Sequence, residues 1–184
     1  MPNEIRTLKI RETSKLLDSH LVLVRKLARI VIISLFAVQI LVVLGQVIWR
    51  FVFNNPFSWS EELARYLQVW LVLLTSSICI KKGRHLAMDY LTHFLPFKYN
   101  KILQIIIMAF IMFFTLTIIT FGIQMIVVTI NQKTAALGVP IGVIYLAFPI
   151  AGLLMFSESL ILTLKLAGAQ DKADLKAIYG KSHE

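Results

Sequence analysis

The chain has 184 residues, of which 58% are hydrophobic, and its mean hydropathy of +0.76 excludes an ordinary soluble domain of this length. The net charge is +9, but the basic residues stand at the ends of long apolar runs. Membrane topology explains such a distribution, so we predict no nucleic-acid partner. The single cysteine, Cys79, excludes an intramolecular disulfide and a cysteine metal cluster. The sequence therefore predicts an all-α integral membrane protein.

The N-terminal segment, residues 1–29, is polar and carries seven Lys and Arg residues. The apolar run that follows is too long for the core of a cleavable signal peptide. From about Asp18 the segment is amphipathic, which predicts a helix on the membrane surface before the first span. That span is expected at residues 30–49. Gln39, Gln46 and Arg50 fall on one helical stripe, which favours packing against another helix over a path for a solute.

A polar cluster separates the first and second spans, after Asn54, Asn55 and Pro56 end the first helix. Its members are Arg50, Trp59, Glu61, Glu62 and Arg65. Helical spacing places Arg65 within reach of both acids, so we predict that Arg50 or Arg65 pairs with Glu61 or Glu62. The cluster has two interpretations, an interfacial helix cap with Ser58 as N-cap and a docking site at the membrane surface.

The second span is expected at residues 62–80 and is followed by a basic segment, residues 81–85. Residues 86–97 are amphipathic and end near Pro96, which predicts a short helix in the plane of the membrane. Asp89 and His93 lie four residues apart on its polar face. With no third ligand nearby, a water-exposed face is favoured over a metal site.

The third span, residues 102–130, has 29 residues without a charge, about 44 Å of helix, so it is expected to tilt or to extend beyond the bilayer. In the fourth span, residues 141–164, Pro149 is expected to free the carbonyl of Tyr145 and to bend the helix. Glu158 is an acid inside this apolar run. It is either a functional intramembrane group or a hydrated residue near the interface.

Orientation follows from the distribution of Lys and Arg. Sixteen of these residues lie before the first span, after the second or after the fourth, and three lie in the opposite loops. Both termini are therefore expected in the cytoplasm, with the polar cluster on the periplasmic side. The predicted organisation is a cytoplasmic segment (residues 1–29), a four-helix membrane domain (residues 30–166) and a cytoplasmic tail (residues 167–184).

Motifs for catalysis are missing from the sequence, which has no GxSxG, HExxH or P-loop pattern. We therefore predict that the chain is not an enzyme, binds no metal and needs no cofactor. Four spans without paired broken helices are few for a complete ion-coupled carrier. Small residues suited to tight helix contacts predict that part of the exterior faces another protein. These residues are Gly122, Ala147, Ala151 and Gly152.

Several segments in order resemble the small membrane (Q) subunit of tripartite ATP-independent periplasmic (TRAP) transporters. They are Arg50-Phe51, residues 57–65 (FSWSEELAR), residues 82–85 (KGRH) with Asp89, and residues 136–140 (ALGVP) with Tyr145 and Pro149. The resemblance implies a bacterial inner-membrane subunit of a sodium-coupled transporter for an organic acid, of the carboxylate or sialic acid type. It implies a large membrane subunit and a periplasmic substrate-binding protein as partners, with this chain as a scaffold in the lipid bilayer.

Two other functions remain open from the residues alone. The chain is either a self-sufficient four-helix exporter of the multidrug type or a membrane assembly or anchor protein. Such an exporter needs an acid deep in a span, and Glu158 is the candidate for that role.

Overall fold

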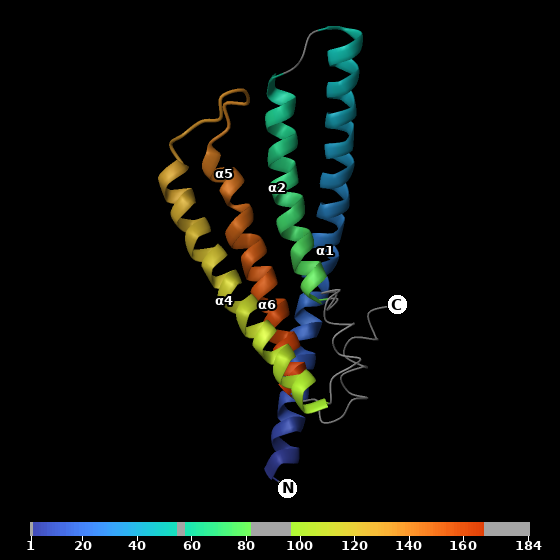
Figure 1. The fold of residues 1–184 in the computed structure, drawn as a ribbon, viewed down its shortest axis with the longest axis vertical. Helices are drawn as coiled ribbons and strands as arrows, with labels where there is room; N and C mark the ends of the chain where they lie inside the picture. Colours follow the sequence, from blue (N-terminus) through green and yellow to red (C-terminus); the bar gives the residue numbers. More distant parts are fainter. Residues whose placement is uncertain (1, 55–57, 82–96, 168–184) are drawn as a thin grey trace. The chain divides into compact units, whose positions relative to one another are not determined.

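The computed structural model describes residues 2–54, 58–81 and 97–167, and within these ranges the regular elements are helices (Figure 1). The helices are α1 (Pro2–Val52), α2 (Ser58–Lys81), α4 (Phe97–Thr129), α5 (Ile141–Tyr145) and α6 (Ala147–Ala167). Four segments of the described chain are long and apolar enough to cross a membrane: Leu21–Val52, Ser58–Ile80, Tyr99–Thr129 and Ile141–Ala167. The predicted all-α fold with four spans is confirmed.

Helix α1 differs from the prediction at its N-terminal side. It is a single helix of 51 residues, about 76 Å long, with no break before Ile30. The expected separate helix on the membrane surface is therefore wrong for residues 18–29, which continue directly into the span. The physical reason is that the connecting residues contain neither Pro nor Gly, so nothing in the sequence ends the helix there.

A short in-plane helix is expected at residues 86–97. Residues 86–96, which include Asp89 and His93, lie outside the described residues. Phe97 is the first residue of α4, which has 33 residues and contains the whole uncharged run of the third span except Ile130. The expected tilt or extension of this long span stays a prediction.

The fourth span consists of α5 and α6, which follow one another in Figure 1. The boundary between them falls at Leu146. Pro149 has no N–H to donate to the carbonyl of Tyr145, so the regular helical hydrogen bonding is lost one turn before the proline. The helix boundary falls at the turn where Pro149 was expected to act, while the expected bend stays a prediction. Nearby backbone bonds continue across the interruption, from the N–H of Leu146 to Gly142 and from the N–H of Ile150 to Leu146.

Two compact parts of the chain are described separately. The first part contains Met1–Arg25, Ser77–Leu116 and Leu153–Glu184, and the second contains Lys26–Ser76 and Thr117–Gly152. In the first part α4 contacts α6, because Lys101 Nζ donates to the carbonyl of Ala167 and Thr163 Oγ1 lies 4.0 Å from Met112 Sδ. In the second part the start of α6 lies against α4 near Gly122.

The small residues of the fourth span are buried inside the subunit. Ala147 and Ala151 have no exposed surface, and Gly152 is also buried. Gly122 of α4 lies so close to α6 that a Cβ placed on it would be 2.6 Å from the Cβ of Phe148. The expectation that these small residues mark a face for another protein is therefore wrong. They serve close helix packing within the chain.

Candidate functional site

Glu62 is the acid of the polar cluster with the most contacts. Its Oε1 accepts a hydrogen bond of 2.7 Å from the hydroxyl of Tyr66, one turn along α2. Its Oε2 accepts hydrogen bonds from the backbone N–H groups of Ala136 (2.9 Å) and Leu137 (3.0 Å). Both carboxylate oxygens are therefore engaged by groups of the same chain, and the side chain connects α2 to the loop between α4 and α5.

The α4–α5 loop, residues 130–140, has a defined internal structure. The N–H of Thr134 donates to the carbonyl of Val139, and Thr134 Oγ1 accepts from the N–H of Val139 in return. Gly138 has a φ of +67°, a conformation that favours glycine, and Lys133 and Pro140 form an isolated antiparallel bridge. The loop thereby presents the amides of residues 136 and 137 to the Glu62 carboxylate.

Glu61 has a different partner from Glu62. It lies in the first turn of α2, and its Oε1 accepts a hydrogen bond of 3.1 Å from Gln46 Nε2 of α1. The side chain of Glu61 is exposed, whereas Glu62 is half-buried. The two neighbouring acids thus connect α2 to two different segments, Glu61 to α1 and Glu62 to the α4–α5 loop.

The predicted pairing of these acids with Arg50 or Arg65 is wrong. The structure gives the two carboxylates an amide, a phenol and two backbone N–H groups as partners, and both arginine side chains are exposed. The reason is that Tyr66 already occupies the i+4 position of Glu62, while the folded loop supplies donors that helical spacing cannot reveal.

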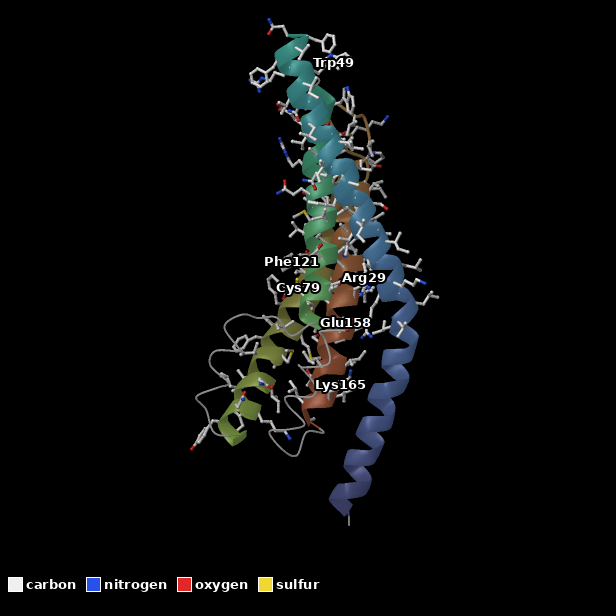
Figure 2. The ribbon with its side chains drawn as sticks, turned by 90° about the vertical axis from the view of Figure 1, so that its right-hand side faces the viewer. Arg29, Trp49, Cys79, Phe121, Glu158 and Lys165 are labelled. Atoms are coloured by element: carbon white, nitrogen blue, oxygen red, sulfur yellow. The ribbon has the colours of Figure 1, made fainter. Side chains whose placement is uncertain are left out.

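Aromatic side chains stand at the ends of α1 and α2 near this cluster in sequence. The rings of Trp49 and Phe53 lie 4.4 Å apart, and Figure 2 labels Trp49 near the C-terminal end of α1. Trp59, at the start of α2, is 43% exposed. Tryptophan at the end of a span is typical of the interface between membrane and water. We therefore place the C-terminal end of the first span and the start of the second span at the interface between membrane and water.

A stripe of half-buried residues follows one side of α1 from Leu21 to Gln46 at alternating spacings of three and four. It contains Leu21, Arg25, Ala28, Ile32, Leu35, Gln39, Val42 and Gln46. Gln39 and Gln46 lie on this stripe, as does Val42, but Arg50 is exposed and does not continue it. The polar member that sequence reasoning missed is Arg25, which precedes Gln39 by two heptads. This seven-residue spacing was the signal for it.

Glu158 is buried within the chain and paired, while its predicted depth in the membrane stays a prediction. Arg25 Nε donates to its Oε1 at 2.5 Å, and Arg25 Nη2 donates to its Oε2 at 2.7 Å. The side chains of Arg25 and Glu158 are 12% and 8% exposed, and Figure 2 labels Glu158 on α6. A two-pronged arrangement of this kind is the strong form of an Arg–carboxylate contact. It joins the N-terminal half of α1 to the C-terminal half of α6.

Comparison with known proteins places this chain in a family. Residues 39–167 match the model of the DctQ component of the tripartite ATP-independent periplasmic transporters. The sialic acid TRAP transporter permease protein SiaT of Haemophilus influenzae (strain 86-028NP) is 29% identical over 126 residues, which cover 66% of this chain and 20% of that protein. This chain therefore corresponds to about a fifth of the length of SiaT.

Two shorter relatives are small permease proteins. One, described as a TRAP transporter small permease of Haemophilus influenzae (strain ATCC 51907), is 29% identical over 132 residues, 72% of this chain and 82% of that protein. The sialic acid TRAP transporter small permease protein SiaQ of Vibrio cholerae is 32% identical over 76 residues, 41% of this chain and 44% of that protein. The chain belongs to the DctQ-component family and is a small TRAP transporter permease subunit.

Proposed function

We propose that this small permease subunit acts as a scaffold for a larger membrane subunit, which moves an organic acid of the carboxylate or sialic acid type with a sodium gradient. A periplasmic substrate-binding protein would deliver the acid. The observation that carries the proposal is the match of this chain to a fifth of the longer SiaT permease, because a segment of this kind is there part of a larger transport polypeptide. The shorter small permease relatives support a separate subunit with the same role.

The contacts of the acids in the spans support a scaffold over a self-sufficient exporter. Such an exporter needs an intramembrane acid that is free to bind a proton, an ion or a cationic substrate. Both oxygens of Glu158 are bonded to Arg25, and both oxygens of Glu62 are bonded to Tyr66 and the α4–α5 loop. In the described spans these carboxylates serve contacts inside the subunit. A membrane anchor remains the second candidate, since it too needs no free acid.

Reconstitution separates these functions. Proteoliposomes that contain the purified chain alone are expected to take up no labelled carboxylate or sialic acid under a sodium gradient. Proteoliposomes with the chain, its large subunit and the binding protein are expected to show uptake, and omission of this chain is expected to abolish it. Uptake or export by the chain alone would favour the exporter. Uptake without the chain would favour an anchor or assembly role.

The proposed location is the bacterial inner membrane with both termini in the cytoplasm. The charge distribution supports this orientation. The Arg25–Glu158 contact is consistent with it, because it brings the beginning of the first span and the later part of the fourth span together on one side. With four spans, an even number, the two ends of the membrane domain lie on the same side of the membrane.

Thiol labelling tests the orientation. In a Cys79→Ala background, single cysteines at Asn54 and Gln132, both exposed, are expected to react with a membrane-impermeant maleimide added to the periplasmic side. A cysteine at Ser182 is expected to react only after the cytoplasmic side is opened. Labelling of the Asn54 position from the cytoplasm alone would contradict the proposed orientation.

A further inference from the structure

The membrane-spanning part of helix α1 is less buried within the chain than the other three spans. No residue from Leu21 to Val52 is fully buried, and the contact stripe is only half-buried. The remaining sides of this segment expose large apolar residues such as Leu23, Leu41 and Phe51. Lipid tails are as apolar as these side chains, so the hydrophobic effect contributes little to the association of helices in a bilayer. The apolar part of the stripe therefore leaves the position of α1 weakly determined.

The polar residues of the stripe can determine that position. Arg25, Gln39 and Gln46 are separated by multiples of seven residues, so they occupy one heptad position, together with Ile32. A polar residue at such a position in a helix seam specifies register, because any shifted arrangement leaves it without a partner. Two of the three polar residues donate to acids on other helices, Arg25 to Glu158 of α6 and Gln46 to Glu61 of α2.

The two polar contacts are not equivalent. Gln46 lies near the end of α1 that continues through a short connection into α2, so the chain itself holds Gln46 near Glu61. Arg25 lies about 21 residues earlier, or about 32 Å along the helix, and so is far from this connection. Its partner Glu158 is 133 residues away in the sequence. The position of the N-terminal half of α1 therefore depends far more on Arg25 than on Gln46.

We infer that the Arg25–Glu158 pair is a positioning pair, which fixes the register of α1 on α6, and that this fixed position is required for assembly with the large subunit. The second half of the inference rests on the proposed function. Arg25 and Glu158 are positioning residues in this account, because neither is placed in contact with the transported solute.

The first test measures the position of α1 in the isolated chain. Spin labels on cysteines at Leu23 and Leu160, both exposed and both in the first compact part, report the separation of α1 and α6. In a Cys79→Ala background with the pair intact, we expect one narrow distance distribution. With Arg25→Met and Glu158→Leu combined, we expect a broad distribution or a second distance. An unchanged narrow distribution would overturn the inference.

The combined apolar variant also separates positioning from stability. Replacing a buried ion pair by apolar residues of similar size is often neutral or stabilising. We therefore expect the Arg25→Met and Glu158→Leu protein to keep a thermal midpoint at or above that of the wild type, yet to recover at least about tenfold less large subunit on co-purification. Recovery equal to that of the wild type would mean that the pair only contributes stability, and would overturn the inference.

Single and exchanged variants test whether the pairing itself matters. Arg25→Gln takes the guanidinium away from the buried Glu158 carboxylate, and Glu158→Gln takes the carboxylate away from Arg25. Each is expected to lower recovery of the large subunit about tenfold or more. The exchanged variant, with Arg25→Glu and Glu158→Arg together, is expected to restore recovery to within about threefold of the wild type. Lys26→Gln is the matched control, because Lys26 is the next residue on α1 and is exposed. It is expected to behave as wild type.

The outcomes distinguish the inference from the proposed function. If the wild-type chain does not recover a large subunit, the scaffold function fails, while the distance measurement still decides whether the pair positions α1. If the wild type recovers it and the exchanged variant is as defective as the single variants, one of the two residues has an individual role. The positioning account would then be wrong.

Discussion

Gly122→Val is expected to destabilise the folded subunit strongly, because α4 and α6 are too close at this position to accept a side chain. A Cβ at residue 122 would lie 2.6 Å from the Cβ of Phe148 and 3.1 Å from Cδ of Pro149. Neither atom can move away by a side-chain rotation, since one is attached directly to the backbone and the other belongs to a ring. Overpacking of this kind costs about 1–3 kcal/mol, or more when the backbone must shift.

The midpoint of thermal unfolding in detergent measures this effect. Gly45→Val is the matched control, because Gly45 lies in α1 and a Cβ there would meet no atom within 4 Å. We expect a clear decrease for Gly122→Val and little change for Gly45→Val. Equal midpoints for the two variants would show that the separation of α4 and α6 at Gly122 does not limit stability.

The close approach at Gly122 lies next to a feature that the sequence reveals. Pro149 interrupts the fourth span at Leu146, one turn before the proline, and Phe148 and Pro149 are the residues that meet Gly122. A proline within an apolar run predicts such an interruption directly, since the missing N–H is a property of the residue itself. The number of spans was predictable for a similar reason, because each span depends on the composition of one continuous segment.

The partners of the charged residues could not be predicted in the same way. The contact between Glu62 and Leu137 joins positions 75 residues apart, and that between Arg25 and Glu158 joins positions 133 apart. Helical spacing suggests only partners within one or two turns, so it favoured Arg65 for the acids of α2. From its charge alone, Arg25 is one of the seven Lys and Arg residues of the N-terminal segment. Its place on the heptad of Gln39 and Gln46 was visible in the sequence, but Glu158 as its partner was not.

Glu62→Ala is expected to release the α4–α5 loop from α2. The substitution removes the acceptor of two backbone N–H groups, those of Ala136 and Leu137, and of the Tyr66 hydroxyl. Hydrogen bonds to a charged acceptor are stronger than those between neutral groups, so the amides lose their best partner. We expect hydrogen exchange at residues 136 and 137 to become faster by about tenfold or more in the variant.

Glu61→Ala is the matched control for this measurement. Glu61 is the neighbouring acid with the same charge, but its carboxylate accepts from Gln46 of α1, whereas the loop N–H groups of residues 136 and 137 donate to Glu62. We expect exchange at residues 136 and 137 to be unchanged when Glu61 is replaced. Glu62→Gln is expected to give an intermediate rate, because its amide oxygen can still accept both N–H groups but carries no charge. Exchange that is equally slow in Glu62→Ala and the wild type would contradict this account.

The same variants separate the two interpretations of the polar cluster in the complete transporter. If the loop conformation supports transport, Glu62→Ala is expected to lower uptake in the reconstituted system, while Glu62→Gln retains more of it. If the cluster receives a soluble partner through its charges, Glu61→Ala is expected to lower uptake as well, with a dependence on salt, since exposed charges act mainly on the rate of encounter. The structure favours the first result for Glu62, because both oxygens of its carboxylate are already bonded within the subunit.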